Sequence, residues 1–197
     1  SAELLENGMV KQEDVPRFVG HIRAEAQRLV TLIGDIIRLS QLDEGDEMPR
    51  ETVDLLTLSQ EAADDLKTAA AEKKVSVTVD GKTACLDGVR RLLYEVIYNL
   101  CDNAIKYNVE GGSVKMTVGE QDGKAVVSVS DTGIGIDKKD LPHIWERFWQ
   151  ADSSRGVDRG SGLGLAMVKQ IADAHGGKLS VESEPGQGSS FSYSMEC

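Results

Sequence analysis

The spacing of the apolar residues changes at an acidic segment, residues 45–51, and this change divides the chain into two parts. Ahead of the segment, apolar residues recur every seven positions at Ile22, Leu29 and Ile36. This period predicts a helix from Pro16 to Leu42 with a coiled-coil seam, and such a seam needs a partner helix. The opening residues, SAELLENG, are typical of the last turns of another helix that ends at Gly8. Residues 1–44 therefore predict a partial helical hairpin, and residues 45–51 predict a linker.

After the linker, the apolar residues follow the shorter periods of an α+β domain, residues 52–197. Alternating runs predict strands at residues 75–79, 113–118 and 125–130, and a closing hairpin at residues 178–196. Helical spacing predicts helices at residues 58–73, 89–107 and 163–175. Turn signals stand at Asp80-Gly81, Asp122-Gly123 and Pro185-Gly186. A domain of this length buries roughly 70% of its unfolded surface, so we expect one sandwich of helices on a sheet.

The composition argues against several classes of protein. A formal net charge of -11 is unfavourable for binding a nucleic-acid backbone. No apolar run approaches the roughly 20 residues that a membrane span needs, so we expect no membrane contact from this chain. The cysteines are Cys85, Cys101 and Cys197. Their odd number and the lack of C-x-x-C spacing indicate a reducing compartment and argue against a disulfide or zinc framework.

The predicted helix at residues 89–107 has one polar and one apolar face. On the polar face, Glu95, Asn99 and Asn103 are four residues apart, and Lys106 and Tyr107 follow three and four residues after Asn103. Asparagine is a poor residue for the interior of a helix, so two of them one turn apart point to a function. An amide oxygen can hold one position of an octahedral Mg²⁺, with water and phosphates at the others. The alternative is a solvated helix face.

The sequence DTGIGI, residues 131–136, follows a predicted strand directly. Asp131 ends the apolar run, and Gly133 and Gly135 remove side chains from its surroundings. A carboxylate there accepts a hydrogen bond from an exocyclic amine and repels a carbonyl oxygen, which favours adenine over guanine. The alternative is a turn or hairpin that binds nothing.

Residues 160–165, GSGLGL, place three glycines at the start of the last predicted helix. The free N–H groups and positive dipole end of a helix suit an anion, and phosphate is the natural candidate. The spacing matches neither a dinucleotide fingerprint nor a P-loop, and the alternative is a flexible surface loop. An aromatic cluster precedes these glycines and consists of Trp145, Phe148 and Trp149. Together they predict a lid at residues 150–161, hinged on the aromatic residues and mobile without a ligand.

Four segments, taken in this order, resemble the motifs of sensor histidine kinases. YEVIYNLCDNAIKY is similar to their N box, DTGIGI to the first glycine box, ERFWQADSS to the F box and GSGLGL to the second glycine box. The resemblance implies a Bergerat-type ATP-binding fold, a mixed sheet with helices on one face, at residues 52–197. It also implies that residues 1–44 are part of the family's dimerisation domain. The family shares its ATP-binding fold with gyrase, mismatch-repair and chaperone ATPases.

The resemblance implies a role for each residue of these motifs. Asn103 is expected to hold Mg²⁺, Asn99 to lie nearby, and Lys106 to contact a phosphate. Tyr107 would form a wall of the nucleotide pocket, and Asp131 would hold the adenine amine. The other residues expected to contact ATP are Gly133, Gly135, Ile136, Phe148, Gly160, Gly162, Leu163, Gly164 and Leu165.

Two positions bear on the transfer step. Relatives that hydrolyse ATP have a water-positioning glutamate where this chain has Asn99, so the resemblance implies transfer to a protein acceptor. Many family members have an arginine where this chain has Gln150, and Arg155 is the expected source of that contact to the γ-phosphate. Asn99, Lys106 and Arg155 are therefore the expected catalytic residues.

The phosphoacceptor of this family is a histidine followed by an acidic residue. None of the three histidines meets this pattern, since an isoleucine follows His21 and His143 and a glycine follows His175. The resemblance therefore implies the catalytic ATP-binding region of a sensor histidine kinase, cut after its acceptor, which binds ATP without phosphorylating itself.

The resemblance also implies the partners and the location. A response regulator would receive the phosphoryl group, and the full-length protein would form a homodimer through the helical hairpin, weakened in this chain. The chain would be cytoplasmic, within a protein anchored in the bacterial membrane. The alternatives are a nucleotide-binding regulatory module without transfer activity and an ATP-hydrolysing clamp of the gyrase or chaperone kind.

Overall fold

The computed structural model describes residues 11, 14–16, 18–20, 22–23, 26, 29–30, 33–34, 48–151 and 161–197. The chain divides into two compact units, residues 1–44 and 45–197. In the first unit, the described residues from 15 to 34 are helical, in agreement with the helix predicted there. The predicted partner turns, residues 1–8, lie outside the described residues. Within the part of the chain that is described, no helix is both long and apolar enough to cross a membrane.

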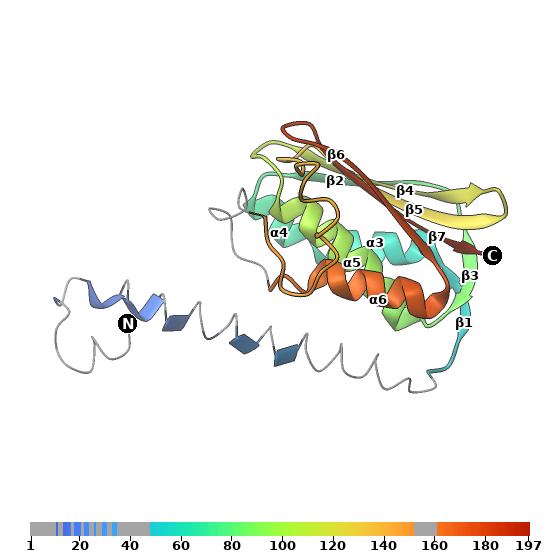
Figure 1. Cartoon of the computed structure of the whole chain (residues 1–197), viewed down its shortest axis with the longest axis horizontal. Coiled ribbons are helices and arrows are strands. Elements are labelled where there is room, and N and C mark those ends of the chain that lie inside the picture. Colours follow the sequence, from blue (N-terminus) through green and yellow to red (C-terminus); the bar gives the residue numbers. More distant parts are fainter. Residues whose placement is uncertain are drawn as a thin grey trace. The chain divides into compact units, whose positions relative to one another are not determined.

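The second unit contains both strands and helices (Figure 1). Its strands are β1 (Glu51–Asp54), β2 (Ser76–Gly81), β3 (Cys85–Gly88), β4 (Ser113–Gln121), β5 (Lys124–Asp131), β6 (Lys178–Glu184) and β7 (Gly188–Glu196). Its helices are α3 (Leu55–Asp65), α4 (Lys67–Glu72), α5 (Arg90–Lys106) and α6 (Gly164–His175). The predicted α+β class is therefore confirmed.

Five strands form the main sheet in the order β2-β4-β5-β7-β6. β2 runs parallel to β4, and the other neighbours are antiparallel, so the sheet is mixed. β1 and β3 pair in a separate two-stranded antiparallel sheet. Within the main sheet, Asp131 at the end of β5 lies opposite Val114 at the start of β4. The loop after β5 and the segment that joins α5 to β4 are therefore at the same end of the sheet.

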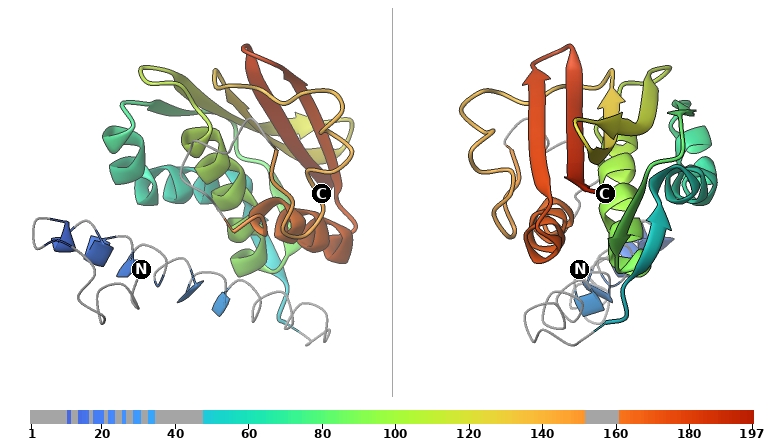
Figure 2. Two further views of the ribbon diagram at one scale, coloured as in Figure 1. Left: turned by 60° about the vertical axis from the view of Figure 1, so that its left-hand side comes forward. Right: turned by 90° about the vertical axis from the view of Figure 1, so that its right-hand side faces the viewer.

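The helices α3, α5 and α6 cover one face of the main sheet (Figure 1, Figure 2). Alternate residues of the central strands are buried beneath them: Val114, Met116, Val118, Ala125, Val127 and Val129. Serines lie between these residues on β5 and pair across to β7, with hydroxyl oxygens 2.7 Å apart for Ser128 and Ser192 and 2.8 Å apart for Ser130 and Ser190. A sheet that is covered on one face requires this alternation. The predicted two-layer sandwich is confirmed.

Two of the predicted turns have different outcomes. Asp122 and Gly123 join β4 to β5 with positive φ at both residues, as a two-residue hairpin turn needs. Asp80 and Gly81 do not form a turn between hairpin strands, because they end β2 and pair with the parallel strand β4. A Cβ atom on Gly81 would lie 1.9 Å from the carbonyl oxygen of Val118, so close approach of the backbones requires this glycine.

The start of the second unit also differs from the prediction. Glu51 was predicted to end the linker, but it begins β1, and β3 has no counterpart among the predicted strands. The single helix predicted at residues 58–73 is two helices, α3 and α4. α3 begins earlier than predicted because Asp54 caps it, with Oδ1 accepting a hydrogen bond from the N–H of Leu56 at 3.1 Å.

A buried histidine joins the end of α6 to the start of α5. The ring nitrogen Nε2 of His175 accepts a hydrogen bond from the N–H of Val89 at 3.2 Å, and Nδ1 lies 3.0 Å from the carbonyl oxygen of Ile171. Accepting at Nε2 requires the proton to be on Nδ1, so this imidazole is neutral. Burial lowers the pKa of His175, and its hydrogen bond to Ile171 opposes that effect only in part. The next residue, Gly176, ends α6 in the left-handed conformation, as is usual for a glycine that follows a helix.

We expect the second unit to lose stability as the pH falls from about 7.5 to about 5.5 across the ordinary histidine pKa of about 6.5. Below that value the unfolded chain binds a proton that folded His175 excludes, because its folded pKa is lower. The stabilisation is complete above the unfolded pKa and is lost as the pH falls toward the folded pKa. Urea unfolding followed by the fluorescence of Trp145 and Trp149 measures the effect.

The substitution His175→Asn removes the titrating group and should remove its share of this pH dependence. Ser59→Ala is the matched control, because the buried Ser59 hydroxyl also donates to a carbonyl four residues back, that of Leu55 at 2.8 Å. This control should lower stability by about 1 kcal/mol at both pH values. A pH slope that is the same in His175→Asn as in the unsubstituted chain would contradict the assignment.

Candidate functional site

Asn99 and Asn103 lie one turn apart on α5, and both side chains are half-buried. Nδ2 of Asn99 donates to the carbonyl oxygen of Glu95 at 2.8 Å, which leaves its Oδ1 available to another group. The side chain of Asn103 has no hydrogen-bond partner among the residues that the structure describes. An amide on this face that makes no hydrogen bond to the described residues is available to a ligand.

The predicted glycine-rich helix start lies against these asparagines. α6 begins at Gly164, and a Cβ atom there would be 3.0 Å from Oδ1 of Asn99 and 3.8 Å from Nδ2 of Asn103. The preceding Leu163 is fully buried, and its N–H donates to the hydroxyl of Ser161 at 3.2 Å. Leu165, in the first turn of α6, is half-buried. The two motifs therefore form one surface, although more than fifty residues separate them in the sequence.

A lysine and a tyrosine end α5. Nζ of Lys106 lies 2.5 Å from Oδ2 of Asp102, one turn back on the same helix. Burial lowers the pKa of Lys106, but the charge of Asp102 and its hydrogen bond outweigh that effect, so the net pKa is raised and the lysine stays a cation. Burial also raises the pKa of Tyr107, so the phenol is neutral. These residues contribute a partly exposed positive charge and an aromatic ring.

Asp131 ends β5 with one carboxylate oxygen occupied. Its Oδ1 accepts hydrogen bonds from the N–H of Gly133 at 2.7 Å and from the N–H of Ser189 at 3.3 Å. No hydrogen bond reaches Oδ2 from the described residues. Burial raises the pKa of Asp131, and the two backbone hydrogen bonds lower it in part. One oxygen therefore fixes the side chain while the other is available to a donor.

The loop after Asp131 is pressed against α5 on one side and the β6–β7 hairpin on the other. A Cβ atom on Gly133 would lie 2.3 Å from the carbonyl oxygen of Tyr107. Gly135 has a φ of +67°, and a Cβ atom there would lie 2.0 Å from the carbonyl oxygen of Glu184. The N–H of Ile136 donates to the hydroxyl of Ser183 at 2.8 Å. Both glycines are thus required by close packing of backbones.

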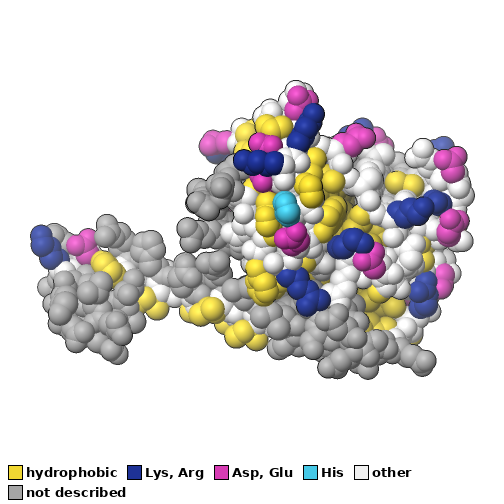
Figure 3. Space-filling model, in the orientation of Figure 1, with side chains coloured by type: hydrophobic (Ala, Val, Ile, Leu, Met, Phe, Trp, Pro, Cys, Tyr) yellow, Lys and Arg dark blue, Asp and Glu magenta, His cyan; other side chains and the backbone are white. Residues whose placement is uncertain are grey.

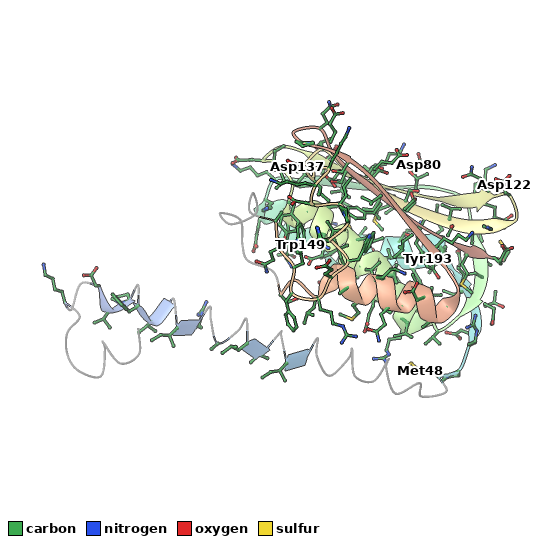
Figure 4. All side chains as sticks on the ribbon, viewed as in Figure 1. Met48, Asp80, Asp122, Asp137, Trp149 and Tyr193 are labelled. Atoms are coloured by element: carbon green, nitrogen blue, oxygen red, sulfur yellow. The ribbon has the colours of Figure 1, made fainter. Side chains whose placement is uncertain are left out.

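The aromatic residues before the predicted lid have separate partners. The ring of Trp145 meets that of Phe191 edge-on at 6.0 Å, and Trp149, labelled in Figure 4, stacks on His143 at 6.3 Å. Phe148 is 59% exposed, and its N–H donates to the carbonyl oxygen of Gly162 at 2.9 Å.

The backbone contact between Phe148 and Gly162 brings the two ends of the predicted lid together. Gln150 is half-buried, whereas residues 152–160, including the predicted site residues Arg155 and Gly160, lie outside the described residues. The predicted mobility of the lid therefore stays a prediction.

Sequence reasoning missed the start of β7. Besides the hydrogen bond from Ser189 to Asp131, a Cβ atom on Gly188 would lie 1.9 Å from the carbonyl oxygen of Asp131. Gly188 also has a positive φ of +96°. The signal that was available is a glycine just beyond the predicted turn at Pro185-Gly186, which marks close backbone approach.

The candidate residues gather at one end of the main sheet. Asp137, just beyond the Asp131 loop, lies toward one end, and Asp122, in the β4–β5 turn, lies at the other (Figure 4). On the face drawn in Figure 3, acidic and basic side chains of the second unit are interspersed. The site is therefore distinguished by its asparagines, glycines and single free carboxylate oxygen, and these groups suit a phosphate, a metal ion and a base amine.

The elements that form this site match a known family. A family model described as histidine kinase-, DNA gyrase B-, and HSP90-like ATPase matches residues 88–196. The chain belongs to this ATPase family. α5, the Asp131 loop and α6 all lie within the matched residues, so the ATPase domain contains the whole candidate site.

Relatives of this ATPase domain are sensor kinases. The chain is 37% identical over 186 residues to the sensor-like histidine kinase SenX3 of Mycolicibacterium smegmatis. The matched region covers 93% of this chain and 48% of the relative. It is 33% identical over 182 residues to the sensor histidine kinase YkoH of Bacillus subtilis (92% and 39%). It is 35% identical over 200 residues to the phosphate regulon sensor protein PhoR of Pseudomonas aeruginosa (96% and 44%). The chain thus spans about half, or less, of the length of these relatives.

Solved structures share the ATPase fold. Full-length ShkA in complex with AMPPNP has a TM-score of 0.77 and 29% identity, covering 97% of this chain and 40% of that one. The mycobacterial sensor histidine kinase MprB has a TM-score of 0.66 and 26% identity, with 75% and 97% covered. The Acinetobacter baumannii histidine kinase AdeS, at 21% identity, has a TM-score of 0.78 with 99% and 90% covered, a likeness of fold alone. The predicted resemblance to the catalytic ATP-binding domain of sensor histidine kinases is confirmed.

Proposed function

We propose that this chain is the catalytic region of a sensor histidine kinase and transfers the γ-phosphoryl group of ATP to a histidine that the chain does not carry. The bond from the γ-phosphorus to the bridging oxygen breaks, a bond to an imidazole nitrogen forms, and ADP leaves. A response regulator aspartate then receives the group. The observation that carries this proposal is the placement of the α5 asparagines against the start of α6, with the free oxygen of Asp131 at the same end of the sheet. The names of the relatives support it.

We assign recognition of the nucleotide base to Asp131 and Tyr107. Oδ2 of Asp131 accepts a hydrogen bond from the exocyclic amine of adenine. The hydrogen bonds that Oδ1 accepts from the N–H groups of Gly133 and Ser189 hold the carboxylate in place. A guanine carbonyl at the same point would be repelled by this oxygen. Tyr107 supplies a wall, and its carbonyl oxygen fixes the loop by accepting from the N–H of Ile134 at 3.0 Å.

The residues present fit a Mg²⁺ ion that is bound together with the triphosphate. Asn103 offers a half-buried amide oxygen, and among the described residues no group of three or more His, Cys, Asp or Glu side chains forms a metal cage. Mg²⁺ keeps several waters and is usually held by few protein oxygens plus phosphates, so one amide ligand suits it. Bound there, the ion would neutralise charge on the phosphate oxygens.

We assign Asn99, Lys106 and Arg155 to phosphoryl transfer rather than to hydrolysis of ATP. The Nδ2 atom of Asn99 is bound to its own helix, and an amide cannot take a proton from water, so this position has no general base. Lys106 stays charged and contributes positive potential to the phosphates. We assign the contact to the γ-phosphate to Arg155, in the lid.

The first unit is assigned to dimerisation. Its described residues include large apolar side chains that are 51–63% exposed, namely Val19, Leu29, Val30 and Ile33. Figure 3 shows apolar side chains at the surface of this unit. Such a surface needs another helix, so we assign residues 1–44 to the dimerisation hairpin of a longer kinase. We assign residues 45–50 to the linker and residues 51–197, from the start of β1, to the catalytic domain. We place the chain on the cytoplasmic side of that membrane-anchored protein.

We expect this chain to bind ATP, to leave its own histidines unlabelled and to label an acceptor in trans. None of His21, His143 and His175 precedes an acidic residue, so the chain lacks the base expected beside the acceptor. The test incubates the chain with γ-labelled ATP, Mg²⁺ and an added acceptor-domain protein, a helical hairpin that carries a histidine followed by an acidic residue. Acid-labile, alkali-stable label should appear on the added domain only.

The control replaces the acceptor histidine of the added domain by glutamine, which should abolish labelling. Label on a histidine of this chain would show that the acceptor has been assigned wrongly. ATP binding without any transfer would favour a regulatory module. Release of inorganic phosphate without transfer would favour an ATP-hydrolysing clamp.

A further inference from the structure

A residue to which no role has been assigned joins the end of α5 to the start of β4 and the loop after β5. Asn108 is 8% exposed. Its Nδ2 donates to the carbonyl oxygens of Ala104 and Ser113, each at 3.1 Å. Its Oδ1 accepts from the N–H of Val109 at 2.9 Å and from the hydroxyl of Thr132 at 3.3 Å. Both donors and both acceptor positions of the amide are therefore used.

Two of these hydrogen bonds join segments that are far apart in the sequence. Ser113 begins β4, and Thr132 is the residue next to Asp131. Thr132 is itself joined to Ser113 by two hydrogen bonds. The Thr132 hydroxyl accepts from the N–H of Ser113 at 2.9 Å, and the Thr132 N–H donates to the carbonyl oxygen of Ser113 at 3.1 Å. Asn108 therefore connects the last turn of α5, the first residue of β4 and the residue beside the candidate base contact.

The backbones around this amide leave little room for adjustment. A Cβ atom on Gly112 would lie 2.1 Å from Oδ1 of Asn108, and one on Gly133 would lie 3.0 Å from Cα of Asn108. Both glycines therefore permit the close approach of α5, the β4 segment and the Asp131 loop. A fully hydrogen-bonded polar group in such a tight setting specifies one arrangement.

We propose that Asn108 is a positioning residue for purine recognition, which sets the place of the Asp131 carboxylate relative to the asparagines on α5. This inference rests on the proposed function, because it takes Asp131 as the acceptor of the adenine amine. α5 carries the groups assigned to the metal and phosphates, and β5 carries the group assigned to the base. One nucleotide engages both only if helix and loop keep one spacing. Loss of Asn108 should therefore weaken the amine contact and spare the phosphate contacts.

The experiment compares ATP with the triphosphate of purine riboside, which lacks the exocyclic amine, by titration calorimetry on the whole chain. The unsubstituted chain should prefer ATP by about tenfold or more, the value of a hydrogen bond to a charged group. In Asn108→Ala this preference should fall to about threefold or less, with the affinity for the analogue changing less than about twofold. A role in stability alone would weaken both nucleotides equally.

Two further variants keep the test decisive. Thr132→Val removes the exposed hydroxyl that donates to Asn108 and accepts from the N–H of Ser113, while the other bonds of Asn108 stay in place. It therefore tests the link between Asn108 and the loop if Asn108→Ala does not fold. It should also reduce the preference for ATP. Val118→Ala is the control, because Val118 is buried in β4 away from Asp131 and its loss lowers stability without reaching the loop. The control should keep the full preference for ATP.

The outcomes separate the inference from the function on which it rests. Equal affinities for ATP and the analogue in the unsubstituted chain would overturn the assignment of Asp131 to the adenine amine. A preference in the unsubstituted chain that persists in folded Asn108→Ala and in Thr132→Val would overturn the positioning role of Asn108 alone. Equal weakening of both nucleotides by these variants would overturn it too.

Discussion

Asp131→Asn is expected to weaken the binding of ATP and of ADP by about ten- to a hundredfold each. The asparagine carbonyl can still accept from the N–H groups of Gly133 and Ser189, so the loop should keep its shape. The amide nitrogen then occupies the place of Oδ2. Because this nitrogen and the exocyclic amine of adenine are both hydrogen-bond donors, no hydrogen bond forms between them. ATP and ADP should suffer alike because both carry the same base. Titration calorimetry with each nucleotide measures the change.

The matched control for this prediction is Asp122→Asn. It makes the same chemical change at the β4–β5 turn, at the opposite end of the sheet, where a left-handed backbone tolerates asparagine. Its nucleotide affinity should equal that of the unsubstituted chain. Unchanged affinity for both nucleotides in Asp131→Asn would refute the assignment of this carboxylate to the base.

Asn103→Ala is expected to abolish the effect of Mg²⁺ on ATP affinity and to reduce phosphoryl transfer to an added acceptor by at least about a hundredfold. The reason is that its amide has no partner among the described residues and is the protein oxygen assigned to the metal. Removing it breaks no hydrogen bond to a described residue, so stability should change little. ATP binding with Mg²⁺ and with EDTA gives a ratio of affinities, and that ratio should fall to about one.

Gln121→Ala is the control for the loss of an amide, since Gln121 lies at the distal end of β4. It should keep both the Mg²⁺ effect and the transfer rate. A Mg²⁺ effect of normal size in Asn103→Ala would show that another group holds the metal, and transfer at the normal rate would exclude Asn103 from the reaction.

The helices that carry the site could be predicted because their signals are local. The predicted helix at residues 89–107 is α5, with Val89 and Tyr107 as its caps, and the helix predicted at residues 163–175 is α6. In each case the apolar residues recur at helical spacing and cover one face. The turn at Asp122-Gly123 was predictable for a similar reason, since few residues other than asparagine, aspartate and glycine adopt positive φ easily.

The strands β1 and β3 could not be predicted in the same way. Each has four residues, too few for a clear alternation. Each is stabilised by pairing with the other, although α3, α4 and β2 separate them in the sequence. The turn predicted at Asp80-Gly81 failed for a related reason. β2 pairs in parallel with β4 as far as Gly81, so Asp80 and Gly81 remain part of the strand. The sequence of a strand does not show whether its neighbour is parallel or antiparallel, so this pairing could not be predicted from it.

The sequence alone determined which chemical groups the site contains, because the asparagines, the aspartate and the glycines stand in local motifs with helical or strand spacing. Only the tertiary structure decided which atoms of those groups remain free. Oδ1 of Asp131 is occupied by Ser189 from another strand, Oδ1 of Asn99 faces the start of α6, and Asn108 uses its whole amide to join three elements. These contacts form between residues far apart in the chain, so they depend on how the helices and the sheet pack and leave no mark on the local sequence.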